Sequence, residues 1–118
     1  LQMSEPQLLL SWERLTSELM QDTRRFSASF RHNLAHYINQ ILLDGLCLLA
    51  EIGYLPPAEK LGSLQKVDGK TAQLRVLVRQ CYQQEALGEK RYEHHQDRIN
   101  EVRKMIGGWL KYLQEEGR

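Results

Sequence analysis

The sequence predicts an all-α protein folded as an antiparallel up-down four-helix bundle. Apolar residues recur at intervals of three and four in four successive segments, and no segment alternates apolar and polar residues as a strand does. The connections between the segments are short, which favours antiparallel neighbours. The length of 118 residues fits a single domain over residues 1–118, large enough to bury a core without metals or disulfides.

The first helix is predicted over residues 4–22. Ser4 and Gln7 have the spacing of a capping box, in which two side chains satisfy backbone groups at the start of a helix. Four apolar residues follow at four-three-four spacing: Leu8, Trp12, Leu15 and Leu19.

The second helix is predicted over residues 29–53, with one face that is apolar along its length. That face consists of Leu34, Ile38, Ile41, Gly45, Leu48 and Ile52. Because Leu42, Leu46 and Leu49 widen it, we expect contact with more than one neighbour, either the other helices or another subunit. Gly53 and two prolines at 56 and 57 end the helix.

The third helix is predicted over residues 58–84 and has basic residues on both edges of its apolar stripe. The stripe consists of Leu61, Leu64, Val67, Thr71, Leu74, Val78 and Cys81. Arg75 and Arg79 lie one turn apart on one edge, and Lys66 and Lys70 lie on the other. Residues 24–84 hold eight basic and four acidic side chains, a surplus that suits a polyanion, although the whole chain carries only +1.

The fourth helix is predicted over residues 88–114 and contains two adjacent glycines. Its stripe consists of Tyr92, His95, Ile99, Val102, Ile106, Trp109 and Leu113. Gly107 and Gly108 together cost the helix about 2 kcal/mol relative to alanines. We therefore expect their bare backbone to admit a neighbouring helix or a large ring, and we assign Gly107, Gly108 and Trp109 to packing inside the bundle or between subunits.

Cysteine usage and hydropathy predict a soluble, cytosolic protein. Cys47 and Cys81 lie in apolar helical patterns and match no disulfide framework or zinc motif, so we expect both to be reduced core residues. The longest apolar stretch, residues 41–50, is too short to span a bilayer and contains Asp44. The N-terminus has no secretion-signal pattern.

The sequence favours binding over catalysis. His32 and His36 have the spacing of two metal ligands on one helix face, but no adjacent carboxylate completes a metalloprotease motif. Four acidic residues spaced by four lie on the last helix: Glu89, Glu93, Asp97 and Glu101. A di-iron site needs Glu-x-x-His pairs from two helices, so a charged solvent face is the preferred interpretation. We expect no catalytic residue, metal, cofactor or small-molecule substrate.

Residues 74–113 resemble the C-terminal half of the Avd family, the accessory variability determinants of diversity-generating retroelements. In that family an arginine-containing helix precedes a tyrosine and a Met-x-Gly-Gly-Trp-Leu-Lys ending, here Arg75 and Arg79, Tyr92, and residues 105–111. Arg24 to Phe26, followed by Arg31, resembles the basic-Phe-Pro segment before the family's second helix, so the similarity covers residues 23–113. The chain departs from the family at Ser27, Ala35 and Arg103, where proline, glycine and glycine are common.

The resemblance implies a homopentameric ring of four-helix bundles that binds a reverse transcriptase and its template-repeat RNA. Such a protein supports mutagenic complementary-DNA synthesis in the cytoplasm of a bacterium or phage host, without catalysing it. The residues expected to contact the enzyme or RNA are basic: Arg24, Arg25, Arg31, Lys66, Lys70, Arg75 and Arg79. Each is equally compatible with solvated surface charge.

Two alternatives remain open. The bundle proteins encoded in ribosomal-RNA intervening sequences share the fold, although their Ala-Glu-Gly signature is only loosely matched around residue 51. A protein-only oligomeric scaffold is the other. An RNA binder loses affinity steeply as salt rises, whereas an apolar protein contact changes little.

Overall fold

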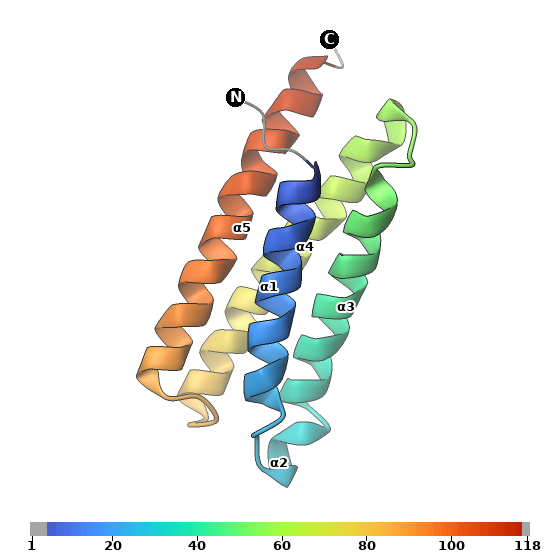
Figure 1. The fold of residues 1–118 in the computed structure, drawn as a ribbon. Helices are drawn as coiled ribbons and strands as arrows, with labels where there is room; N and C mark the ends of the chain where they lie inside the picture. Colours follow the sequence, from blue (N-terminus) through green and yellow to red (C-terminus); the bar gives the residue numbers. More distant parts are fainter. Residues whose placement is uncertain (1–4, 117–118) are drawn as a thin grey trace.

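The computed structural model of the chain describes residues 5–116 (Figure 1). Four long helices, α1 (Glu5–Thr23), α3 (Leu34–Ile52), α4 (Pro57–Gln83) and α5 (Glu89–Glu116), are joined by short connections. A single-turn helix, α2 (Ala28–Arg31), lies in the first connection. Residues 5–116 contain no strand, so the predicted all-helical fold is confirmed.

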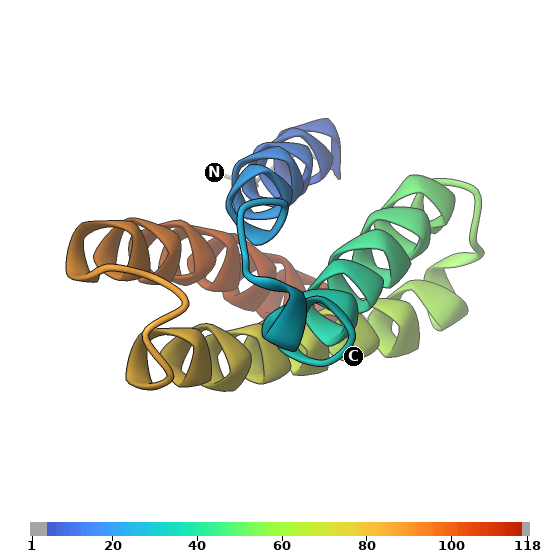
Figure 2. The same cartoon turned by 90° about the horizontal axis from the view of Figure 1, so that it is seen from below.

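The four long helices alternate in direction, as an up-down bundle requires (Figure 1). α1 packs against α3 and α5, and α4 packs against the same two helices from the other side (Figure 2). Each long helix therefore has two neighbours and at least one face turned outward. The bundle measures 48 × 23 × 19 Å. No helix in the described part of the chain is long and apolar enough to cross a membrane.

The core is built from the apolar stripes of the four helices. The predicted stripes of α4 and α5 are buried over residues 64–81 and 95–109. On α3 the buried stripe is rotated from the predicted one: Leu42 and Leu49 are buried, whereas Ile41 is half-buried. This rotation leaves an apolar flank of α3 at the surface.

The connection between α1 and α3 divides the predicted helix over residues 29–53 into two. α2 ends at Arg31, and α3 begins at Leu34 after Asn33, whose φ of −126° and ψ of −94° are not helical. The side-chain oxygen of Asn33 accepts a hydrogen bond from the Leu34 amide at 2.5 Å, so Asn33 caps the new helix. The capping box predicted at the start of α1 includes Ser4, which lies outside the described residues.

The closest helix approach lies between α1 and α3, at Trp12 and Gly45. A Cβ atom on Gly45 would lie 2.6 Å from Cε2 of Trp12 and closer still to Cζ2. The indole Nε1 of the fully buried Trp12 donates a hydrogen bond to the Leu42 carbonyl at 2.8 Å. Only glycine fits at position 45, because the indole occupies the place of its side chain.

The prediction that a helix or a large ring packs closely on Gly107 and Gly108 is wrong within the chain. Both glycines are exposed, and no atom lies within 4 Å of a Cβ built on either. The reason is their position on the helix: Trp109 is buried with 7% of its surface exposed, but the two residues before it point away from the inner stripe. An indole does pack on bare backbone here, but the partners are Trp12 and Gly45.

The two cysteines have different environments. Cys81 is buried as expected, and burial raises the pKa of its thiol to about 11. Cys47 is exposed, so the expectation that it belongs to the core is wrong. It lies on the outer face of α3, which is apolar on more sides than the core covers.

Candidate functional site

The polar side chains between α1 and α5 form a network that joins the two helices. Glu18 of α1 accepts a hydrogen bond from His94 Nε2 at 2.5 Å, and its Oε1 lies 3.3 Å from Arg98 Nε. One turn further on, Asp22 Oδ2 accepts hydrogen bonds from Arg91 Nε at 2.8 Å and His95 Nε2 at 2.6 Å. The four partners of these two acids all come from α5, from positions at least 69 residues away along the chain.

The Asp22–His95 pair consists of a carboxylate and a neutral imidazole. Burial opposes ionisation of Asp22, but the hydrogen bonds from Arg91 and His95 outweigh it and hold the pKa of Asp22 below its ordinary value. Burial lowers the pKa of His95 and outweighs the attraction of Asp22. His95 is fully buried and its Nδ1 has no partner among the described residues, so a second proton there would be an unsatisfied buried donor. These groups hold α1 to α5.

Two of the seven predicted contact residues have a polar partner within the chain, and the other five form no ion pair within the described residues. Lys70 Nζ lies 4.0 Å from Asp44 Oδ2 of α3, and Arg31 Nε donates to the Phe26 carbonyl at 3.4 Å. The other five predicted contact residues are exposed and form no ion pair with the side chains that the structure describes: Arg24, Arg25, Lys66, Arg75 and Arg79.

The seven predicted contact residues do not form one patch. Arg24, Arg25 and Arg31 lie at the end of the bundle where α1 turns into α2 (Figure 1). Lys70 faces α3, and Lys66 lies one turn before it on the same edge of α4. Arg75 and Arg79 lie on the opposite edge, facing α5; Gln96 Nε2 of α5 donates to the Arg75 carbonyl at 3.2 Å.

The α4–α5 edge holds two further cations that the sequence analysis did not select. Arg103 and Lys104 of α5 line a shallow groove of about 470 Å³ with Asp68 of α4 and, from α5, Asn100, Gly107 and Leu110. Asp68 lies seven residues before Arg75, so the groove and the two arginines occupy the same edge. Adjacent basic residues in a helix that also contains many acids gave no distinct sequence signal.

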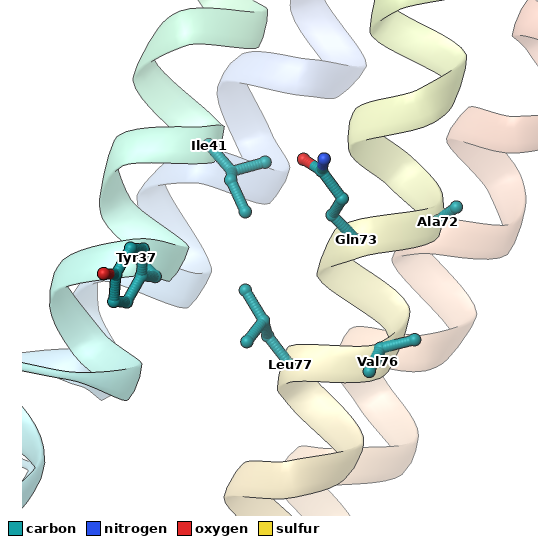
Figure 3. Close-up of a pocket in the computed structure, with 6 residues that line it drawn as sticks. All are labelled: Tyr37, Ile41, Ala72, Gln73, Val76 and Leu77. Atoms are coloured by element: carbon teal, nitrogen blue, oxygen red, sulfur yellow. The ribbon is translucent and has the colours of Figure 1, made fainter.

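Apolar side chains reach the surface on both sides of α3. Towards α4 a shallow groove of about 650 Å³ is lined by Tyr37, Ile41, Ala72, Gln73, Val76 and Leu77. Ile41 of α3 and Leu77 of α4 point into the space between the two helices (Figure 3). On its outer face α3 exposes Leu43, Cys47 and Ala50 at four-three spacing, and the exposed Tyr54 follows in the turn after the helix. These four residues are here termed the outer stripe.

The candidate metal ligands lie apart from one another or at the surface. His32 and His36 are exposed. The acids of α5 are also exposed, which confirms their interpretation as a solvent face: Glu89, Glu93, Asp97 and Glu101. No three metal-binding side chains come together within the described range.

The structure defines a four-helix bundle whose buried polar groups join helices and whose free cations and apolar residues face outward. A family model described as bAvd-like matches residues 6–113. The chain belongs to the bAvd-like family, which confirms the resemblance to Avd proteins seen in the sequence. Proteins of this kind are generally accessory and non-catalytic. Comparison with curated proteins gives no match.

Proposed function

We propose that the chain is the non-catalytic accessory protein of a diversity-generating retroelement, binding its reverse transcriptase and template-repeat RNA to support mutagenic complementary-DNA synthesis. Family membership supports the class of protein. The observation that carries the binding role is the pair Arg75 and Arg79, exposed one turn apart on α4 without an acidic partner in residues 5–116. Guanidinium groups suit phosphates and carboxylates because their donors form paired hydrogen bonds.

We propose further that five copies assemble into a ring through the outer stripe of α3. Leu43 is 43% exposed and Tyr54 91% exposed, and the three stripe residues within α3 have the spacing of a helix-packing seam. A contact of this kind would also cover Cys47. Five copies would present five pairs of α4 arginines to one RNA or enzyme, so contacts that are weak singly would act together. The assembly would act in the cytoplasm of a bacterium or phage host.

The binding role is tested by co-purification with the reverse transcriptase encoded beside the gene. We expect the enzyme and its RNA to be retained by the wild-type chain, and less by Arg75→Gln/Arg79→Gln. Arg14→Gln/Lys111→Gln removes the same charge from exposed positions of α1 and α5 and is the matched control. Retention of neither enzyme nor RNA by the wild-type chain would refute the proposal.

The ring is tested by light scattering at micromolar concentration. The expected mass is five times 13.8 kDa. Leu43→Glu places a charge in the proposed contact and should lower the mass, whereas Gln65→Glu, exposed on α4, should not. A wild-type chain that scatters as a monomer would contradict the ring.

A protein-only scaffold is the second candidate, because the α3–α4 groove and the outer stripe are apolar. Salt distinguishes the two. Retention that is unchanged between low and high salt, and indifferent to ribonuclease, would favour the scaffold; retention lost at high salt favours RNA binding. A bundle protein of the ribosomal-RNA intervening-sequence type would retain no reverse transcriptase.

A further inference from the structure

Two tyrosines stack on each other where α4 turns into α5. The ring centroids of Tyr82 and Tyr92 lie 4.5 Å apart and the ring planes differ by 13°. Tyr82 belongs to the last turn of α4 and Tyr92 to the first turns of α5. Tyr82 remains 39% exposed although Tyr92 covers one of its faces.

The turn between the helices fixes this pair. The Ala86 amide donates to the Cys81 carbonyl at 2.8 Å and the Glu85 amide to the Tyr82 carbonyl at 3.1 Å, with Glu85 at a left-handed φ of 63°. This is a Schellman motif, which ends a helix in a defined geometry. Leu87 is buried and anchors the turn to the core. Tyr82 is therefore held in place before any ligand arrives.

Unpaired cations continue from the tyrosine pair along the same edge of the bundle. Arg79 precedes Tyr82 by three residues and Arg75 precedes Arg79 by four, so the three side chains follow one another along the helix surface. Neither arginine forms an ion pair in the described structure, and Arg103 and Lys104 lie further along the edge. A shallow hollow adjoins Tyr82, lined by Gln83, Glu85, Leu87 and Gly88.

An exposed ring at the end of a row of cations suits single-stranded nucleic acid. Phosphates pair with the cations, and an unpaired base stacks on the ring; a duplex has its base faces already covered. We propose that Tyr82, supported from behind by Tyr92, stacks on an unpaired base of the template RNA, while Arg79 and Arg75 neutralise the adjacent phosphates. This inference rests on the RNA-binding part of the proposed function and adds to it a position that reads an unstacked base.

The test is fluorescence anisotropy of a labelled twelve-nucleotide oligoadenylate with the wild-type chain and two variants of Tyr82. Tyr82→Leu removes the aromatic ring and should weaken binding by roughly fivefold or more, since stacking of one base on a side chain has that effect. Tyr82→Phe keeps the ring and should bind as the wild type does. Tyr37→Leu is the matched control, because Tyr37 is 60% exposed on α3, away from the cation row.

The RNA itself supplies a second arm of the test. An oligonucleotide in which several bases are replaced by abasic sites should bind the wild type about as weakly as the intact strand binds Tyr82→Leu. Its affinity for Tyr82→Leu should be little lower than its affinity for the wild type. Thermal melting of each variant establishes that the bundle is folded. A 12-base-pair duplex should be insensitive to Tyr82→Leu.

The outcomes separate this inference from the function on which it rests. A wild-type chain that binds no RNA at low salt would overturn both the RNA-binding proposal and the stacking site. Salt-dependent binding that is equal for wild type and Tyr82→Leu, or equally weakened by Tyr37→Leu, would overturn the stacking site alone and leave RNA binding intact.

Discussion

Replacing Gly45 with alanine tests the packing of α1 on α3 most sharply. The new Cβ would lie within 2.6 Å of the Trp12 ring, so the indole must move. Overpacking of this kind costs about 1–3 kcal/mol. Weakening of the 2.8 Å hydrogen bond from Trp12 to the Leu42 carbonyl costs about 1 kcal/mol more. The higher helix propensity of alanine returns about 1 kcal/mol, so we expect a net loss of about 1–3 kcal/mol.

Urea denaturation followed by circular dichroism measures this loss. The transition midpoint of Gly45→Ala should fall while the slope stays unchanged, because the area exposed on unfolding is nearly the same. A smaller ring in Trp12→Phe should leave room for the new methyl group, so the double variant should lose less than the sum of the single losses. A Gly45→Ala protein as stable as the wild type, or strictly additive losses, would refute the close approach.

Three further predictions concern the surface of α5 and its contact with α1. Gly107→Ala and Gly108→Ala, measured by urea denaturation of the isolated chain, should each raise stability by roughly 0.5–1 kcal/mol, since nothing lies within 4 Å of the added methyl groups; destabilisation would reveal a close partner there. Asp22→Ala should lower the free energy of unfolding by about 1–3 kcal/mol, because it leaves the buried His95 without its hydrogen-bond acceptor. An unchanged urea midpoint would show that this network does not stabilise the contact between α1 and α5. The melting temperature should fall on acidification. Because the pKa of His95 is lowered in the folded state, the stability that His95 contributes is lost as the pH drops below its unfolded pKa of about 6.5. The stability that Asp22 contributes through its lowered pKa is lost in the same way below about pH 4. Asp22→Ala should flatten the lower part of that profile, and an acid-independent melting temperature would contradict both pKa directions.

Periodicity predicted the helices and most of the core, because burial on one face of a helix imposes a three-four spacing on the sequence. Periodicity did not predict the buried face of α3, because that helix is apolar on several sides. On α3 the pattern alone does not decide which flank faces the core, so Ile41 was expected inside and Cys47 was expected to be buried. The break at Asn33 was missed because apolar spacing continues across it.

The glycines show a second limit of sequence reasoning. A glycine beside a tryptophan in the sequence suggested close packing at Gly107 and Gly108, yet the indole that packs on bare backbone belongs to Trp12, 33 residues before Gly45. Sequence neighbours on a helix point in different directions, so they are poor guides to which groups touch. Gly45 had been placed on the apolar face, but its partner on α1 had no local signal.

Exposure of the basic residues followed from their positions on the helix, but their pairing did not. Lys70, for example, has an acidic neighbour on α3, and Arg75 and Arg79 have none in the described structure. The contacts of Asp22 with Arg91 and His95 span about 70 residues and depend on how α1 packs against α5. Such pairs arise only from the assembled bundle.

Complementary-DNA synthesis in a reconstituted reaction tests the central claim most directly. Purified reverse transcriptase and template-repeat RNA would be incubated with the wild-type chain, with Arg75→Gln/Arg79→Gln, or without the chain, and the DNA product measured. The account predicts abundant product with the wild type, less with the variant, and little without the chain. Equal amounts of product in all three reactions would contradict it.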